Sequence, residues 1–144
     1  MSVETLTSNT RTNSTISHIP RAVINAALRS DTLNICHMNI QSICARQFAK
    51  FNEFKQCFYN SKVDLVCLTE TWLSDKISDD AIAIEGYNLI RNDRIYSRGG
   101  GLCIYYKHDI SCKILSSSEL PYSIDNINIT EYMFVEVVAY NETF

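Results

Sequence analysis

Glycine, proline and long apolar runs are scarce in this sequence. Its 144 residues include only four glycines and two prolines, which excludes a collagen-like repeat. No apolar run approaches the roughly 18 residues that a membrane-spanning helix needs, and Met1 is not followed by the basic and then apolar segments of a signal peptide. We therefore expect an intracellular protein, nuclear or cytoplasmic, that is not secreted and has no membrane partner.

An excess of positive charge is also absent. The chain has 13 lysine and arginine residues against 16 aspartate and glutamate residues, a net charge of −3. This balance excludes a highly basic nucleic-acid coat protein, although it permits a locally basic groove. Hydrophobic residues make up 46% of the chain and charged residues 20%, which is the mixture expected of one globular domain.

Patterns typical of disulfides, zinc sites and covalent catalysis are missing. The six cysteines form no C-x-x-C pair, and Cys36, Cys67 and Cys103 each lie within an apolar segment, so we expect reduced, buried thiols. The three histidines are too far apart in sequence to predict a zinc site. A nucleophilic hydrolase is not supported, because no G-x-S-x-G motif and no informative cysteine–histidine spacing is present.

The N-terminal region differs in composition from the rest of the chain. Residues 1–18 include 11 Ser, Thr and Asn residues and show no hydrophobic period, which predicts a disordered arm. Pro20 and the apolar spacing that follows it predict a short connecting helix over residues 21–29. We therefore divide the chain into an arm at 1–30 and a domain at 31–144.

From residue 32 onwards, the pattern predicts a strand, a helix and a second strand. Residues 32–39 alternate as a strand does, and phenylalanines at helical spacing predict an amphipathic helix over 45–60. Residues 64–69 are almost continuously apolar, which is typical of a strand covered on both faces. This order is that of a βαβ unit.

The remainder of the domain is predicted to be rich in strands. They are expected at 86–90, 102–106, 110–115 and 132–140, with an acidic loop at 73–84 that holds a short helix or edge strand and a polar loop at 121–130. Consecutive strands after one βαβ unit favour a mixed, layered α/β sandwich over a doubly wound parallel sheet.

Two polar side chains stand at the ends of the two best strands. Asn39 ends the first strand and Glu70 comes directly after the second. Because ligands of open α/β sheets bind beyond the carboxyl ends of the strands, both side chains are expected to face one crevice. A carboxylate there can hold a hard cation such as Mg²⁺, and the asparagine amide can orient it. The alternative is that they are a strand terminus and a turn residue only.

Later in the sequence there are three consecutive glycines, and an acidic segment is followed by a basic one. Gly99, Gly100 and Gly101 either cradle a phosphate or let the backbone enter the next strand in close contact with a neighbour. Residues 64–85 carry six acidic residues and one lysine, whereas residues 91–107 carry three arginines and a lysine among tyrosines. An acidic segment beside a basic one suits a phosphodiester substrate, although either block alone is typical of solvated surface.

Four blocks of sequence together resemble a known family. They are residues 33–42 (LNICHMNIQS), 64–73 (DLVCLTETWL), 86–94 (GYNLIRNDR) and 98–105 (RGGGLCIY). In order and spacing they resemble the endonuclease/exonuclease/phosphatase family. More narrowly, they resemble the apurinic-endonuclease-like domain that precedes the reverse transcriptase domain in jockey-type non-LTR retrotransposons.

The resemblance implies a reaction and a set of residues. Glu70 matches the family's metal-binding glutamate, and Asn39 matches the asparagine that lines the site beside it. The family cleaves phosphodiesters with Mg²⁺, or Mn²⁺, and an activated water. In retrotransposons the cleavage nicks target DNA to prime reverse transcription, so the implied partner is DNA. Arg91, Arg94 and Arg98 are then the candidate DNA-binding residues.

The sequence departs from the family pattern in two ways. Gln41 stands where some relatives have an aspartate, and the family's later motifs, among them G-D-x-N and a terminal S-D-H with the catalytic histidine, are not found. The resemblance therefore implies the N-terminal half of the layered α/β fold, with an open sheet edge that promotes association. It also implies little or no nuclease activity by this chain alone.

Two other functions stay open at the level of sequence. One is a non-catalytic, domesticated fragment that binds protein or nucleic acid. The other, which shares the fold, is a phosphoesterase that acts on small phosphates or lipids. The R-G-G-G block and the tryptophan that follows Glu-Thr favour the retrotransposon branch.

Overall fold

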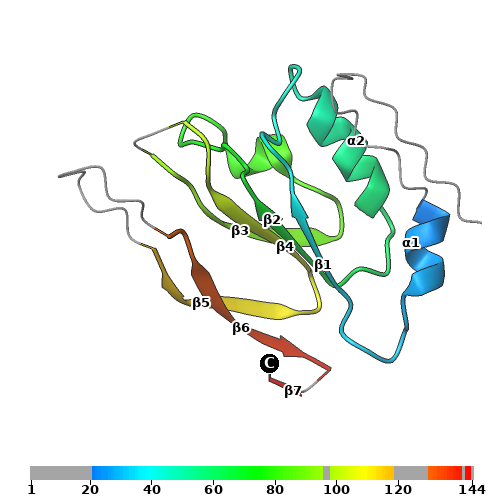
Figure 1. The fold of residues 1–144 in the computed structure, drawn as a ribbon. Coiled ribbons are helices and arrows are strands. Elements are labelled where there is room, and N and C mark those ends of the chain that lie inside the picture. The colour runs from blue at the N-terminus through cyan, green and yellow to red at the C-terminus, as the bar shows by residue number, and fades with distance from the viewer. Residues whose placement is uncertain (1–20, 96–97, 119–129, 141, 144) are drawn as a thin grey trace, which may run out of the picture.

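Two β-sheets and a few short helices make up the described part of the chain (Figure 1). The computed structural model describes residues 21–95, 98–118, 130–140 and 142–143. In chain order the elements are α1 (Arg21–Ala27), β1 (Ile35–Asn39), α2 (Ala49–Phe58), β2 (Leu65–Thr69), the 3₁₀ helix η1 (Asp79–Ile82), β3 (Tyr87–Asn92), β4 (Leu102–Lys107), β5 (Ser111–Ser117), β6 (Met133–Ala139) and β7 (Glu142–Thr143). The predicted mixed α/β class is confirmed. The predicted disordered arm and most of the polar loop at 121–130 lie outside the described residues.

The larger sheet has four strands in the order β1-β2-β4-β3. β1 and β2 are parallel and are connected through α2, whereas β4 is antiparallel to both β2 and β3. The second sheet is antiparallel throughout, in the order β5-β6-β7. One parallel pair followed by antiparallel strands agrees with the predicted βαβ unit and the strands that follow it.

One hydrophobic core lies between α2 and the larger sheet. Phe51, Phe54 and Phe58 of α2 are buried in the same cluster as Val66 and Leu68 of β2. The phenylalanines recur every three to four residues and so form the apolar stripe of the helix. Complete burial of each such side chain contributes about 1.5–3 kcal/mol, which holds the helix on the sheet.

A second hydrophobic core joins the two sheets. Leu65 of β2 and Ile104 of β4 are buried together with Val137 and Ala139 of β6. Neighbouring residues of β2 therefore contribute to different cores, as the almost continuous apolar run predicts. Among the described residues, no helix combines the length and apolar character that crossing a membrane requires.

The helix predicted over 45–60 is shorter than expected. It spans Ala49–Phe58, because Arg46, Gln47 and Phe48 have φ angles of 58°, 54° and 67°. These are left-handed conformations, which cannot continue a right-handed helix. The apolar spacing marks the face of the helix correctly, but it carries no information on these backbone angles.

All six cysteines are free thiols. Burial raises the pKa of Cys67 and of Cys103. A thiol whose pKa is raised reacts slowly, because the thiolate is the reactive form. These side chains fill space in the core.

Candidate functional site

The parallel pairing of β1 and β2 brings Asn39 and Glu70 to the same edge of the sheet. Asn39, the last residue of β1, lies opposite Thr69, the last residue of β2, and Glu70 follows at once. The Asn39 side chain is exposed, and it forms no hydrogen bond with another described residue. Its amide is therefore open to a ligand at this edge.

Backbone hydrogen bonds hold together the two loops that leave these strands. The N–H of Ser42 donates to the carbonyl of Glu70 over 2.8 Å, and the N–H of Ile43 donates to the carbonyl of Thr71 over 3.0 Å. Glu70 and Trp72 have φ angles of 56° and 54°. Such conformations cost about 1–3 kcal/mol in residues other than glycine and are concentrated at functional sites. The local strain points to this loop as the centre of a site.

A buried lysine supports the end of β1. The Nζ of Lys50 donates to the carbonyl of Ile40 and, over 2.9 Å, to the carbonyl of Gln41. Burial lowers the pKa of Lys50, and the charge of Arg46 adds to this effect. Because Ile40 and Gln41 directly follow Asn39, the lysine fixes the backbone that positions the asparagine.

Two donors orient the Glu70 carboxylate. Its Oε2 accepts hydrogen bonds from the indole Nε1 of Trp72 over 2.9 Å and from the backbone N–H of Gly100 over 3.1 Å. The Trp72 bond, and after it the Gly100 bond, lowers the pKa of Glu70 below its ordinary value. The carboxylate is thus ionised at neutral pH, and its Oε1 accepts no hydrogen bond from a described residue.

The triple glycine makes close contacts that a side chain would obstruct. Gly99, Gly100 and Gly101 have φ angles of 90°, 70° and 88°. A Cβ added at Gly101 would lie 2.6 Å from Oγ1 of Thr71, and one added at Gly100 would overlap the guanidinium of Arg94. Of the two roles that the sequence left open for this segment, close approach of the backbone is the one that is observed.

The amides of this segment bind two carboxylates. The N–H of Gly100 donates to Glu70, and the N–H of Gly101 donates to Oε2 of Glu131 over 3.1 Å. The Oε1 of Glu131 accepts from Nε of Arg94 over 2.7 Å. These amides are therefore not open to a phosphate. Sequence reasoning missed Glu131, because a single acidic residue 30 positions from its partner carries no local signal.

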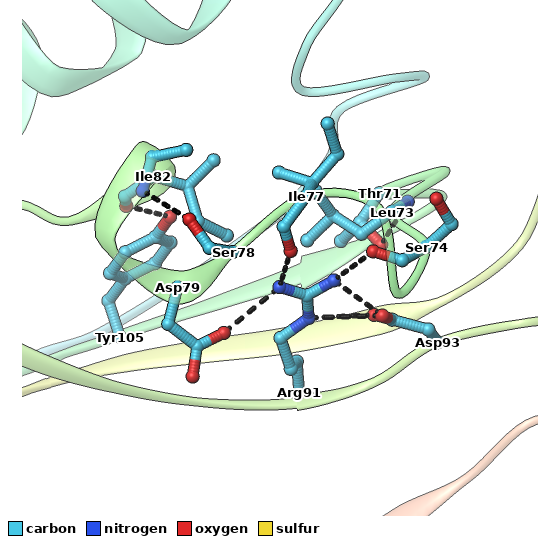
Figure 2. A network of polar contacts seen from close by, with 11 residues as sticks. Thr71, Leu73, Ser74, Ile77, Ser78, Asp79, Ile82, Arg91, Asp93 and Tyr105 are labelled. Carbon is cyan, nitrogen blue, oxygen red and sulfur yellow. Dashed lines mark hydrogen bonds and ion pairs between the residues drawn. The ribbon is translucent and has the colours of Figure 1, made fainter.

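Arg91 lies within a network of polar contacts, which Figure 2 shows. Its guanidinium donates to the carboxylates of Asp93 and Asp79 and to the carbonyls of Ser74 and Ile77, and only 13% of the side chain is exposed. These bonds attach the loop between β2 and β3 to the sheet. The predicted contact between Arg91 and DNA stays a prediction, and the N–H groups that would make it are already used within the protein.

The other two predicted arginines lie near Glu70. Arg94 pairs with Glu131, and its charge contributes to the lowered pKa of Glu70. The guanidinium carbon of Arg98 lies 5.3 Å from the centre of the Trp72 ring, a cation–π contact. Arg98 is exposed and Trp72 is 39% exposed. Arg98 is therefore the better placed of the two to bind a phosphate from solvent.

The donors available to a metal ion at this edge are few. Among the described residues, no three or more His, Cys, Asp and Glu side chains lie together in a group that could hold a metal ion. The set consists of the Glu70 carboxylate and the Asn39 amide. Mg²⁺ is commonly bound by one or two carboxylates together with substrate phosphates and keeps several waters. The residues present fit such a hydrated ion and do not form a complete cage.

The similarity of this chain to known proteins is one of structure. No protein-family model matches the sequence, and no curated protein matches it. The chain is similar to the crystal structure of the AP endonuclease LMAP from Leishmania major, with 19% sequence identity and a TM-score of 0.43. The alignment covers 56% of this chain and 28% of that chain. The matched region is thus a minor part of that protein's length.

Proposed function

We propose that this chain carries the metal-binding part of a DNA endonuclease of the apurinic-endonuclease-like type found in non-LTR retrotransposons. The observation that carries the proposal is the Glu70 carboxylate, which Trp72 and Gly100 orient at the carboxyl ends of two parallel strands, the edge of the sheet where β1 ends at Asn39. The order of four sequence blocks supports it further. The proposed fold is the N-terminal half of the family's layered α/β sandwich.

Each residue of the site has a distinct part in the proposed reaction. Glu70 would hold Mg²⁺ or Mn²⁺, while Trp72 and Gly100 keep its carboxylate in place. When bound, the metal polarises the phosphodiester and lowers the pKa of its bound water. The Asn39 amide donates to a phosphate oxygen without adding charge, and Arg98 attracts the DNA backbone.

The proposed activity of the chain alone is low. Hydrolysis requires a general base within hydrogen-bond reach of the attacking water, and the S-D-H motif that supplies it in the family is not found in the sequence. The metal site and the catalytic step are therefore tested separately.

Mn²⁺ binding tests the metal site directly. Electron paramagnetic resonance is used to titrate Mn²⁺ into the wild-type chain, Glu70→Ala and the control Glu53→Ala, which removes a carboxylate on α2 that pairs with Arg46. We expect binding by the wild type and the control and its loss in Glu70→Ala. Equal binding by Glu70→Ala would contradict the proposal.

Nicking of supercoiled plasmid in the presence of Mg²⁺ tests catalysis with the same variants. Weak nicking that disappears in Glu70→Ala supports an endonuclease.

A second candidate, a DNA-binding module without catalysis, is favoured by the exposed Trp72–Arg98 pair. Retention of DNA by the chain without nicking and without Mn²⁺ binding identifies that module.

A further inference from the structure

Glu131 connects the second sheet to the glycine segment of the larger sheet. It lies just before β6, yet its Oε2 accepts from the N–H of Gly101 and its Oε1 accepts from Arg94. Only 14% of its side chain is exposed. Both carboxylate oxygens are therefore used in a partly buried position, where hydrogen bonds to charged groups are strong.

The bond to Gly101 determines the orientation of a whole peptide group. The N–H of Gly101 and the carbonyl of Gly100 belong to the same planar unit. That carbonyl accepts from the backbone N–H of Trp72 over 2.9 Å. Rotation of the peptide plane would therefore break the bond to Glu131 and the bond to Trp72 together.

This peptide group needs an external support. Gly100 and Gly101 both have positive φ angles, and glycine populates many other conformations at little cost. Without an anchor, the segment has no side chains of its own to keep it in place. The N–H of Gly100 and the backbone of Trp72 would then move, and these two residues supply the donors that orient Glu70.

Arg94 is held by the same carboxylate. Its guanidinium lies against Gly100, where an added Cβ would overlap it, and its Nε donates to Glu131. Glu131 thereby keeps a positive charge beside the glycine segment and near Glu70.

We propose that Glu131 is a positioning residue for the site. It fixes the peptide between Gly100 and Gly101 and the guanidinium of Arg94, so that the Glu70 carboxylate is presented in a single orientation. The expected effect of Glu131 on metal binding rests on the proposed function. Its expected effect on the geometry around Trp72 does not depend on that function.

Trp72 provides a direct readout, because it is the only tryptophan in the chain. Its fluorescence emission is measured in the full chain and in Glu131→Ala, and Mn²⁺ affinity is measured on the same samples. We expect the Trp72 emission of Glu131→Ala to shift to longer wavelength and its Mn²⁺ dissociation constant to rise about tenfold or more, as for other residues that orient a metal ligand. Glu131→Gln keeps one acceptor oxygen and the shape of the side chain, so its effects are expected to be intermediate.

Ser118→Ala is the matched structural control. Ser118 is buried, and its Oγ bonds Asn92 at the end of β3 and the N–H of Tyr132 next to Glu131. This variant also loosens the connection between the sheets but leaves the glycine segment untouched. We expect lower thermal stability with unchanged emission and Mn²⁺ affinity.

The outcomes separate this proposal from the proposed function. Wild-type emission and affinity in folded Glu131→Ala or Glu131→Gln would overturn it, as would equal changes in Ser118→Ala. If the wild-type chain binds no Mn²⁺, the proposed function fails, and the Trp72 emission alone decides the role of Glu131.

Discussion

The indole N–H of Trp72 donates a 2.9 Å hydrogen bond to the Glu70 carboxylate, two residues before it in the chain. This bond is the largest cause of the lowered pKa of Glu70. Both residues have left-handed backbone conformations, and the hydrogen bond links their side chains across this turn. Gly100 also donates to the Glu70 carboxylate, and Arg98 lies over the Trp72 ring.

Replacement of Trp72 by phenylalanine is predicted to raise the pKa of Glu70 towards its ordinary value, because the main donor to the ionised form is lost. A lowered folded-state pKa stabilises the protein above the unfolded-state pKa, and this stabilisation is lost as the pH falls through the folded-state pKa. The pH-dependent part of the difference in unfolding free energy between wild type and Trp72→Phe should therefore vanish in acid. NMR titration of the Glu70 carboxyl carbon, without metal, measures the pKa directly. An unchanged value in Trp72→Phe would show that the indole bond does not form.

Replacement of Gly101 by alanine is predicted to destabilise the protein more than replacement of Gly86. The two glycines have φ angles of 88° and 87°, so both variants incur the cost of a left-handed alanine, about 1–2 kcal/mol. A Cβ at Gly86 has no atom within 4 Å, whereas one at Gly101 would lie 2.6 Å from Oγ1 of buried Thr71. Overpacking adds about 1–3 kcal/mol. Urea unfolding of both variants measures the difference, and equal free energies of unfolding would contradict the close approach.

Replacement of Arg91 by alanine is predicted to cost about 3–5 kcal/mol in the free energy of unfolding. The change leaves the largely buried carboxylate of Asp93 without its partner, and breaking a buried ion pair on one side is strongly destabilising. Arg46→Ala is the control, because Arg46 pairs with Glu53 at an exposed position, where such pairs contribute about 0–1 kcal/mol. Chemical denaturation of both variants tests this. A cost for Arg91→Ala no larger than that for Arg46→Ala would show that the polar network around Arg91 does not stabilise the fold.

Replacement of Arg98 by alanine is predicted to weaken DNA binding without lowering stability. Arg98 is exposed and contacts only the Trp72 ring among the interactions described. Loss of one phosphate contact should reduce the slope of log affinity against log salt concentration by about one. Binding to a duplex oligonucleotide is measured by fluorescence anisotropy at several salt concentrations, with Lys113→Ala on the exposed part of β5 as the control. Identical slopes for wild type and Arg98→Ala would remove Arg98 from the interface.

Sequence patterns predicted the parts of the fold that depend on local periodicity. The phenylalanines of α2 and the apolar run of β2 place their residues in the two cores as expected. The parallel pairing also brings Asn39 and Glu70 to one edge, which followed from the βαβ order. Whether these two residues bind a metal stays a prediction.

The parts that sequence patterns did not predict depend on contacts between distant residues. Arg91 carries the same charge as Arg98 and lies in the same basic block, yet its guanidinium is enclosed by Ser74, Ile77 and two aspartates. Charge alone cannot distinguish an arginine that faces solvent from one that satisfies carbonyls inside the protein. The bond between Glu131 and Gly101 is likewise invisible until the two sheets are in place.

The glycine segment also determines when the site can form during folding. Its amides bind Glu70 and Glu131, each 30 residues away in opposite directions along the chain. Contacts between distant segments form late, because the intervening loops must be closed first. A chain in which only the larger sheet had folded would contain Glu70 and Gly100 but would lack the carboxylate that fixes their arrangement. The bond from the Gly101 amide to Glu131 requires both sheets to be in place, so we expect slow hydrogen exchange at this amide to mark the fully assembled protein.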